Sequence, residues 1–154
     1  MITRIIPLSQ YEKEQHLQFL SDQIKTGGVD KELIPYLSEI NSIEGICTTL
    51  SCAGHKENER SQKGCIRLRL STKMMRKFRR SIPKFYECQN IGYIDQRYHL
   101  GKRYRKYIRE AGGENICEEI MISFLGLEGS PETFHQSIKH IVGVLKKCTH
   151  MHPA

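Results

Sequence analysis

Residues 65–70 read CIRLRL, and this alternation of apolar and basic residues is typical of a β-strand. The apolar residues should face a hydrophobic core, while Arg67 and Arg69 point to the opposite face of the sheet, where they could meet an anion. Residues 71–82 follow with the pattern of a capped amphipathic helix, which we expect to end at Pro83. A strand followed directly by such a helix predicts an α+β fold.

Hydrophobic periodicity predicts the other elements of the fold. Further helices are expected at residues 10–25, 30–40, 100–111 and 131–147, and further strands at residues 46–51, 84–94 and 116–127. The Ser9-x-x-Glu12 spacing is that of a capping box, and Pro35 suggests that its helix starts late or is bent. The almost unbroken apolar run at 116–127 should lie at the centre of the sheet. We therefore predict one α+β domain over residues 1–154, with helices packed on a mixed sheet.

The length and the start of the chain predict its location. At 154 residues the chain can bury a hydrophobic core without help from disulfides or metals. No apolar run approaches the roughly 20 residues that cross a bilayer, and the first residues lack the pattern of an export leader. These features predict a cytoplasmic protein without a membrane partner. Most of its six dispersed cysteines should therefore be reduced, with Cys88 and Cys117 buried as small apolar residues.

Positive charge is concentrated in one part of the chain. Residues 73–109 hold 12 lysines and arginines against two acidic residues, whereas the rest of the chain is slightly acidic. Such a run can be merely the solvated face of a helix, but the local excess favours a polyanion, and Tyr98 and Tyr107 could stack on bases. We predict that the protein binds RNA. The contacts would come from Arg67, Arg69, Arg76, Lys77, Arg79, Arg80, Lys102, Arg103, Arg105 and Lys106.

A candidate site lies in residues 40–55, which read INSIEGICTTLSCAGH. The expected strand ends in small residues and a glycine, which allow backbone N–H groups to approach a phosphate, a carboxylate or a cofactor. We therefore predict a site at residues 49–55. The candidate catalytic residues are Ser51, Cys52 and His55, and the candidate cofactor-binding residues are Thr49, Ser51 and Gly54. The alternative is an ordinary tight turn in which Gly54 has a positive φ.

The same stretch carries a resemblance to a known family. Ile-Asn at residues 40–41, followed by Thr-Leu-Ser-Cys-Ala-Gly at residues 49–54, resembles the Thr-Ser-Ser-Cys-Ser-Gly segment of the third protein of the wybutosine tRNA-modification pathway. The resemblance implies an α+β protein that transfers a methyl group from S-adenosylmethionine to a modified guanosine of tRNA. It also implies a site loop at Ser51, Cys52 and Gly54.

Two other hypotheses remain open. Cys52 and His55 have the Cys-x-x-His spacing of half a zinc site, to which Cys47 or Cys65 could add a ligand. A second ligand pair would have to come from His150 and His152, so no metal is predicted. The protein could also be a non-catalytic RNA-binding or regulatory module, with or without zinc, and whether it is an enzyme is left open.

Overall fold

A computed structural model describes residues 4–57, 60–99 and 115–150. The elements are β1 (Arg4–Ile6), α1 (Gln10–Thr26), the 3-10 helix η1 (Lys31–Leu33), α2 (Ile34–Asn41), β2 (Ile46–Cys52), β3 (His55–Glu57), β4 (Arg60–Gln62), β5 (Gly64–Leu70), α3 (Thr72–Phe85), β6 (Ile91–His99), β7 (Asn115–Phe124) and α5 (Pro131–Cys148). The predicted α+β class is confirmed. The helix expected at 100–111 lies outside the described residues.

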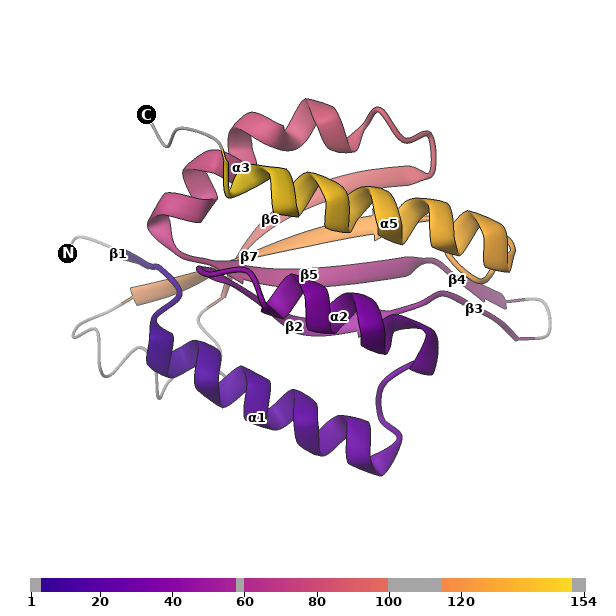
Figure 1. Cartoon of the computed structure of the whole chain (residues 1–154), viewed down its shortest axis with the longest axis horizontal. Helices are drawn as coiled ribbons and strands as arrows, with labels where there is room; N and C mark the ends of the chain where they lie inside the picture. The colour runs from indigo at the N-terminus through magenta and orange to yellow at the C-terminus, as the bar shows by residue number, and fades with distance from the viewer. Residues whose placement is uncertain (1–3, 58–59, 100–114, 151–154) are drawn as a thin grey trace.

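The sheet is mixed and is built around β7. This strand pairs in antiparallel fashion with β5 and β6 and in parallel with β1, while β2 pairs with β5. Strands β3 and β4 form a separate hairpin beyond the ends of β2 and β5 (Figure 1). The prediction that the apolar run at 116–127 is central in the sheet is confirmed.

Helices cover both faces of the sheet. On one face, the apolar side chains of β5 and β7 pack against α2, α3 and α5 in a single buried cluster. Helix α1 runs beside β2 and packs on the face that carries Arg69, and its buried residues are polar: Glu12, Lys13 and His16 (Figure 1). Within the described residues, no helix has the length and apolar character that crossing a membrane requires.

Serine caps start α1, α3 and α5, the three longest helices in the part of the chain that the structure describes, as the sequence predicts. The side chains of Ser9, Ser71 and Ser130 each accept an N–H from the first turn of α1, α3 and α5. Pro83 does not end α3, which continues to Phe85. The last turn is stabilised because Phe85 is fully buried against Phe78, with ring centroids 5.2 Å apart.

Three other predictions need correction or completion. The strand expected at 84–94 is wrong, because α3 and a turn occupy its first half and β6 begins only at Ile91. Strand β1 and the β3–β4 hairpin were not predicted, since each is only three residues long. The helix after η1 starts late, at Ile34 with Pro35 in its first turn, as expected.

Arg69 is the main departure from the predicted RNA-binding set. Its side chain is fully buried, and its guanidinium donates to both carboxylate oxygens of Glu12, at 2.7 and 2.6 Å. It also donates to the carbonyls of Ile6 and Glu118, where β1 takes over from β5 as the neighbour of β7. The prediction that Arg69 contacts RNA is wrong, because α1 covers its face of the sheet. Glu12 is used in this pair rather than in a capping box.

Candidate functional site

Of the predicted site at residues 49–55, residues 49–52 form the end of β2, Ala53 and Gly54 connect the two strands, and His55 begins β3. Ala53 and Gly54 are both buried, and Gly54 has a φ of +97°, which a residue with a side chain rarely adopts. The Leu127 N–H donates to the Ala53 carbonyl at 2.8 Å, so the loop is packed against a second loop at residues 125–129. A side chain at Gly54 would collide with the Glu128 carboxylate. Gly54 is therefore required for the turn and for this packing.

Asp30 lies beside two of the three candidate catalytic side chains, those of Cys52 and His55. Its Oδ2 accepts the Ala53 N–H at 2.8 Å and lies 3.2 Å from His55 Nε2. Ligand atoms of Asp30, Cys52 and His55 all lie within 4.8 Å of one another. Asp30 was not predicted as a site residue because it is more than 20 residues from Cys52 in the sequence. Its position before a helix suggests an ordinary N-cap, but its side chain makes no cap hydrogen bond to η1.

The environment of Cys52 keeps its thiol protonated. Burial raises the pKa of Cys52, and the nearby carboxylates of Asp30 and Glu128 raise it further. The Gly54 N–H, 3.4 Å from the Cys52 sulfur, acts in the opposite direction but does not outweigh them. A neutral thiol can donate a hydrogen bond or lose its proton to a metal, but it is a poor nucleophile.

The other five cysteines offer no competing site. All six cysteines are free, in agreement with the prediction that most are reduced. Burial raises the pKa of Cys47 to about 12 and that of Cys117 to about 11, so both are unreactive at neutral pH. Cys65 faces Cys52 across the β2–β5 pair but is not part of the cluster of Asp30, Cys52 and His55, here called the Asp30 group. Cys117 is buried as expected, whereas Cys88 is half-buried in the turn before β6.

A groove between α1 and β2 lies next to the loop. It has a volume of about 610 Å³ and is lined by Gln15, His16, Gln18, Phe19, Asp22, Thr49 and Leu50. Its apolar part is open to solvent, since Phe19 is 57% exposed and Leu50 48% exposed. A smaller hollow of about 70 Å³ continues it past Ser51 to Gly28 and Val29, beside Asp30. The arrangement can hold a flat apolar group near hydroxyl and imidazole groups.

The predicted cofactor residues are therefore separated. Thr49 and Ser51 line the hollows beside α1, and the Thr49 hydroxyl donates to Glu119 at 3.1 Å. Gly54 lies beyond them, against Glu128. The structure brings Thr49 and Ser51 together at the smaller hollow and places Cys52 and His55 beside Asp30.

The predicted RNA-binding residues have three different environments. Arg76, Arg79 and Arg80 are exposed on α3, although Arg79 lies 3.3 Å from the Glu118 carboxylate. Lys77 was expected on the outer face of α3, but it is buried. Arg67 is half-buried, with its Nε 3.7 Å from Glu119. Lys102, Arg103, Arg105, Lys106 and Tyr107 lie outside the described residues, as does His152.

Comparison with known proteins bears on the segment that holds the loop. Residues 10–56 match the family model of Methyltransferase TYW3. The resemblance predicted for residues 40–55 is thus confirmed over a longer but partial segment, which runs from α1 into β3 and is less than a third of the chain. No curated protein matches the chain. The structure of the PH1069 protein from Pyrococcus horikoshii is similar at 14% identity and a TM-score of 0.44, over 92% of this chain and 94% of that one.

Proposed function

We propose that the protein is an S-adenosylmethionine-dependent methyltransferase that acts on tRNA. One observation carries the proposal. Every residue that lines the α1–β2 groove and the hollow beside it falls within residues 10–56, the segment that matches a methyltransferase family. The matched residues thus come together around a space next to the predicted loop.

The residues of the groove fit such a cofactor. Small-molecule sites are mostly apolar hollows of about 300–1,000 Å³ with a few polar groups, and the groove has that size and character. In the proposal, the exposed ring of Phe19 stacks on the adenine, and Thr49 and Ser51 hold the polar parts. S-adenosylmethionine would supply an electrophilic methyl group there.

The loop would position the acceptor. Methyl transfer needs mainly alignment of the acceptor atom, so no protein nucleophile is required, in agreement with the protonated Cys52 thiol. In the tautomer in which His55 Nε2–H donates to Asp30, Nδ1 is left to accept a proton from the acceptor. Ser51 and Cys52 would contribute hydrogen bonds, and Gly54 would maintain the turn.

The exposed arginines of α3 would bind the tRNA backbone. We expect Arg76→Gln and Arg80→Gln each to weaken tRNA binding and to reduce the slope of log K against log salt by roughly 0.9, because each removes one phosphate contact. Fluorescence anisotropy with labelled tRNA over a range of salt concentrations measures both quantities. Lys25→Gln is the matched control, since Lys25 lies in the last turn of α1, far from α3 (Figure 1). An unchanged slope in both arginine variants would exclude this face as the RNA contact.

A zinc-stabilised RNA-binding module is the second candidate, and the Asp30 group favours it. In a tetrahedral zinc site with Zn–N and Zn–O bonds of about 2.0–2.1 Å, the N and O ligands lie about 3.3 Å apart. The separation between His55 Nε2 and Asp30 Oδ2 is 3.2 Å, and Cys52 completes a set of three.

Cobalt(II) tests this candidate directly. If the group binds metal, titrating the metal-free protein with Co²⁺ should produce a thiolate-to-metal charge-transfer band, because metal binding removes the Cys52 proton. Cys52→Ser should abolish the band. Cys65→Ser should retain it, because Cys65 is next to Cys52 in the sheet but outside the group. Absence of the band in the unmodified protein would eliminate the metal hypothesis.

A further inference from the structure

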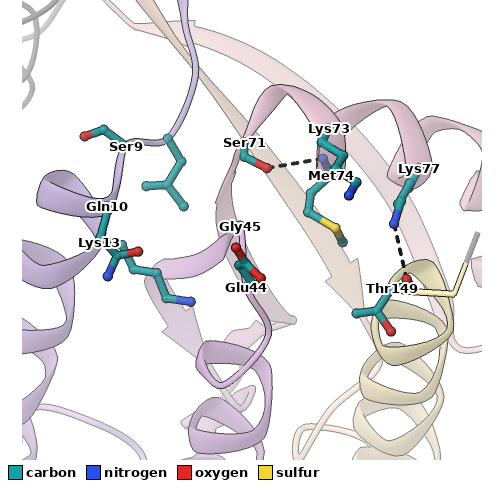
Figure 2. A pocket seen from close by; sticks show the side chains of 11 residues that line it. Ser9, Gln10, Lys13, Glu44, Gly45, Ser71, Lys73, Met74, Lys77 and Thr149 are labelled. Atoms are coloured by element: carbon teal, nitrogen blue, oxygen red, sulfur yellow. Dashed lines mark hydrogen bonds between the residues drawn. The ribbon is translucent and has the colours of Figure 1, made fainter. Parts of the chain in front are cut away.

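We propose that a second cavity, between the first turns of α1 and α3, binds a phosphate group. The cavity, whose lining residues Figure 2 shows, has a volume of about 370 Å³. It includes Glu44 and Gly45, just before β2, and so lies at the opposite end of that strand from Cys52. Three lysines line it, Lys13, Lys73 and Lys77, against a single carboxylate, that of Glu44. It shares no lining residue with the α1–β2 groove, so the inference is independent of methyl transfer.

Two of the three lysine residues are buried, and within the part of the chain that the structure describes their ammonium groups bond to backbone carbonyls. Lys13 is 8% exposed and donates to the Ile43 carbonyl at 2.7 Å, and Lys77 is 5% exposed and donates to the Thr149 carbonyl at 3.2 Å. Among the described residues, none of the three lysines has a carboxylate within 4.0 Å. Burying a charge against neutral partners is costly, and the cost falls when an anion binds beside it.

The backbone adds to this positive field. Helices α1 and α3, of 17 and 14 residues, both begin at the cavity, at the caps Ser9 and Ser71. The positive ends of their dipoles therefore lie at this region, which favours phosphate, although the serine caps already bond the Glu12 and Met74 N–H groups. Figure 2 shows Lys13 on the α1 side of the cavity and Lys73 and Lys77 on the α3 side.

Gly45 forms a fixed wall between the two helices. It has a φ of +81°, and its carbonyl accepts the Ser71 N–H at 2.8 Å. A side chain at this position would press on Ser71 and Met74. The glycine therefore allows the segment before β2 to lie directly against the start of α3 and hold the cavity in shape.

The titration of Lys13 agrees with this assignment. Burial lowers the pKa of Lys13, although the charge of Glu44 partly opposes the shift. A bound phosphate would favour the charged ammonium. The ligand class is a phosphate ester, supplied either by an RNA strand or by a free nucleotide.

The test compares thermal unfolding in potassium phosphate and in potassium chloride at equal ionic strength. We expect the melting temperature to rise with phosphate concentration and to saturate, because a ligand that binds only the folded state stabilises it. Lys77→Gln should weaken the apparent phosphate affinity about tenfold, as expected for loss of one charged hydrogen bond. Lys139→Gln, on the exposed face of α5 and outside the cavity, should leave the affinity unchanged.

A second variant keeps the test valid if the Lys77→Gln protein fails to fold. Lys73 is exposed but lines the same cavity, so Lys73→Gln should fold normally and still lower the phosphate affinity. Competition identifies the source of the phosphate: displacement of a labelled RNA oligonucleotide by inorganic phosphate indicates an RNA strand, and displacement of labelled AMP alone indicates a nucleotide. Equal melting temperatures in phosphate and chloride, or an undiminished phosphate shift in both lysine variants, would overturn the proposal.

Discussion

Replacing Arg69 with methionine is expected to lower the free energy of unfolding by about 3–5 kcal/mol, as found when one partner of a buried ion pair is removed. The variant would leave the Glu12 carboxylate buried without its main partner and would remove the Arg69 hydrogen bonds to the Ile6 and Glu118 carbonyls. The loss should be large because Arg69 joins α1, β1 and β7 through these bonds. Equilibrium unfolding in urea, monitored by circular dichroism, measures it.

Two further variants isolate the buried charge. The double replacement Glu12→Met and Arg69→Met should recover much of the stability, because it removes both charges together. Arg67→Met is the matched control on the same strand: its guanidinium is half-buried and its Nε lies 3.7 Å from Glu119, too far for a strong hydrogen bond, so its loss should cost less than that of Arg69. Equal effects of Arg67→Met and Arg69→Met would contradict the account of the pair.

The Glu12–Arg69 ion pair should also make the free energy of unfolding depend on pH in the acidic range. Burial alone raises the pKa of Glu12, but hydrogen bonds from Arg69 and His16 outweigh it and hold that pKa below its usual value of 4.5. A lowered folded-state pKa means that the stabilisation is fully present above pH 4.5 and is lost as the pH falls through the folded-state pKa. Unfolding free energies measured from pH 6 downward should fall less steeply in Glu12→Gln.

Local signals in the sequence were sufficient for much of the fold. The serines before α1, α3 and α5 cap their helices, and the alternation at 65–70 forms β5 as predicted. Tertiary contacts decided the rest. The alternation along β5 predicts that Arg69 lies on the face of the sheet opposite the main core. That this opposite face is also buried depends on the packing of α1 against it.

The site was predictable only in part for the same reason. The turn at Ala53 and the positive φ of Gly54 follow from short-range patterns and are present, but residues 49–52 of the predicted loop belong to β2. Asp30, the groove with α1 and the packing of Gly54 on Glu128 depend on segments that meet only in the folded chain. Lys77 is a further example. Its place in a basic helix predicts exposure to solvent, but in the folded chain Lys77 is buried and lines a cavity.

Phe19→Ala is expected to weaken binding of S-adenosylmethionine at least about fivefold, because stacking of a base on an aromatic ring contributes about 1–3 kcal/mol. The exposed ring can be removed with little effect on the fold. Ile24→Ala is the matched control, since Ile24 is on the same helix and exposed but does not line the groove. It should bind the cofactor like the unmodified protein.

The most direct test of the central claim is calorimetric titration of the purified, metal-free protein with S-adenosylmethionine. The account predicts saturable one-to-one binding that Phe19→Ala weakens and Ile24→Ala preserves. Absence of saturable binding, together with a melting temperature that the cofactor does not change, would contradict the methyltransferase proposal and leave RNA binding as the function to pursue.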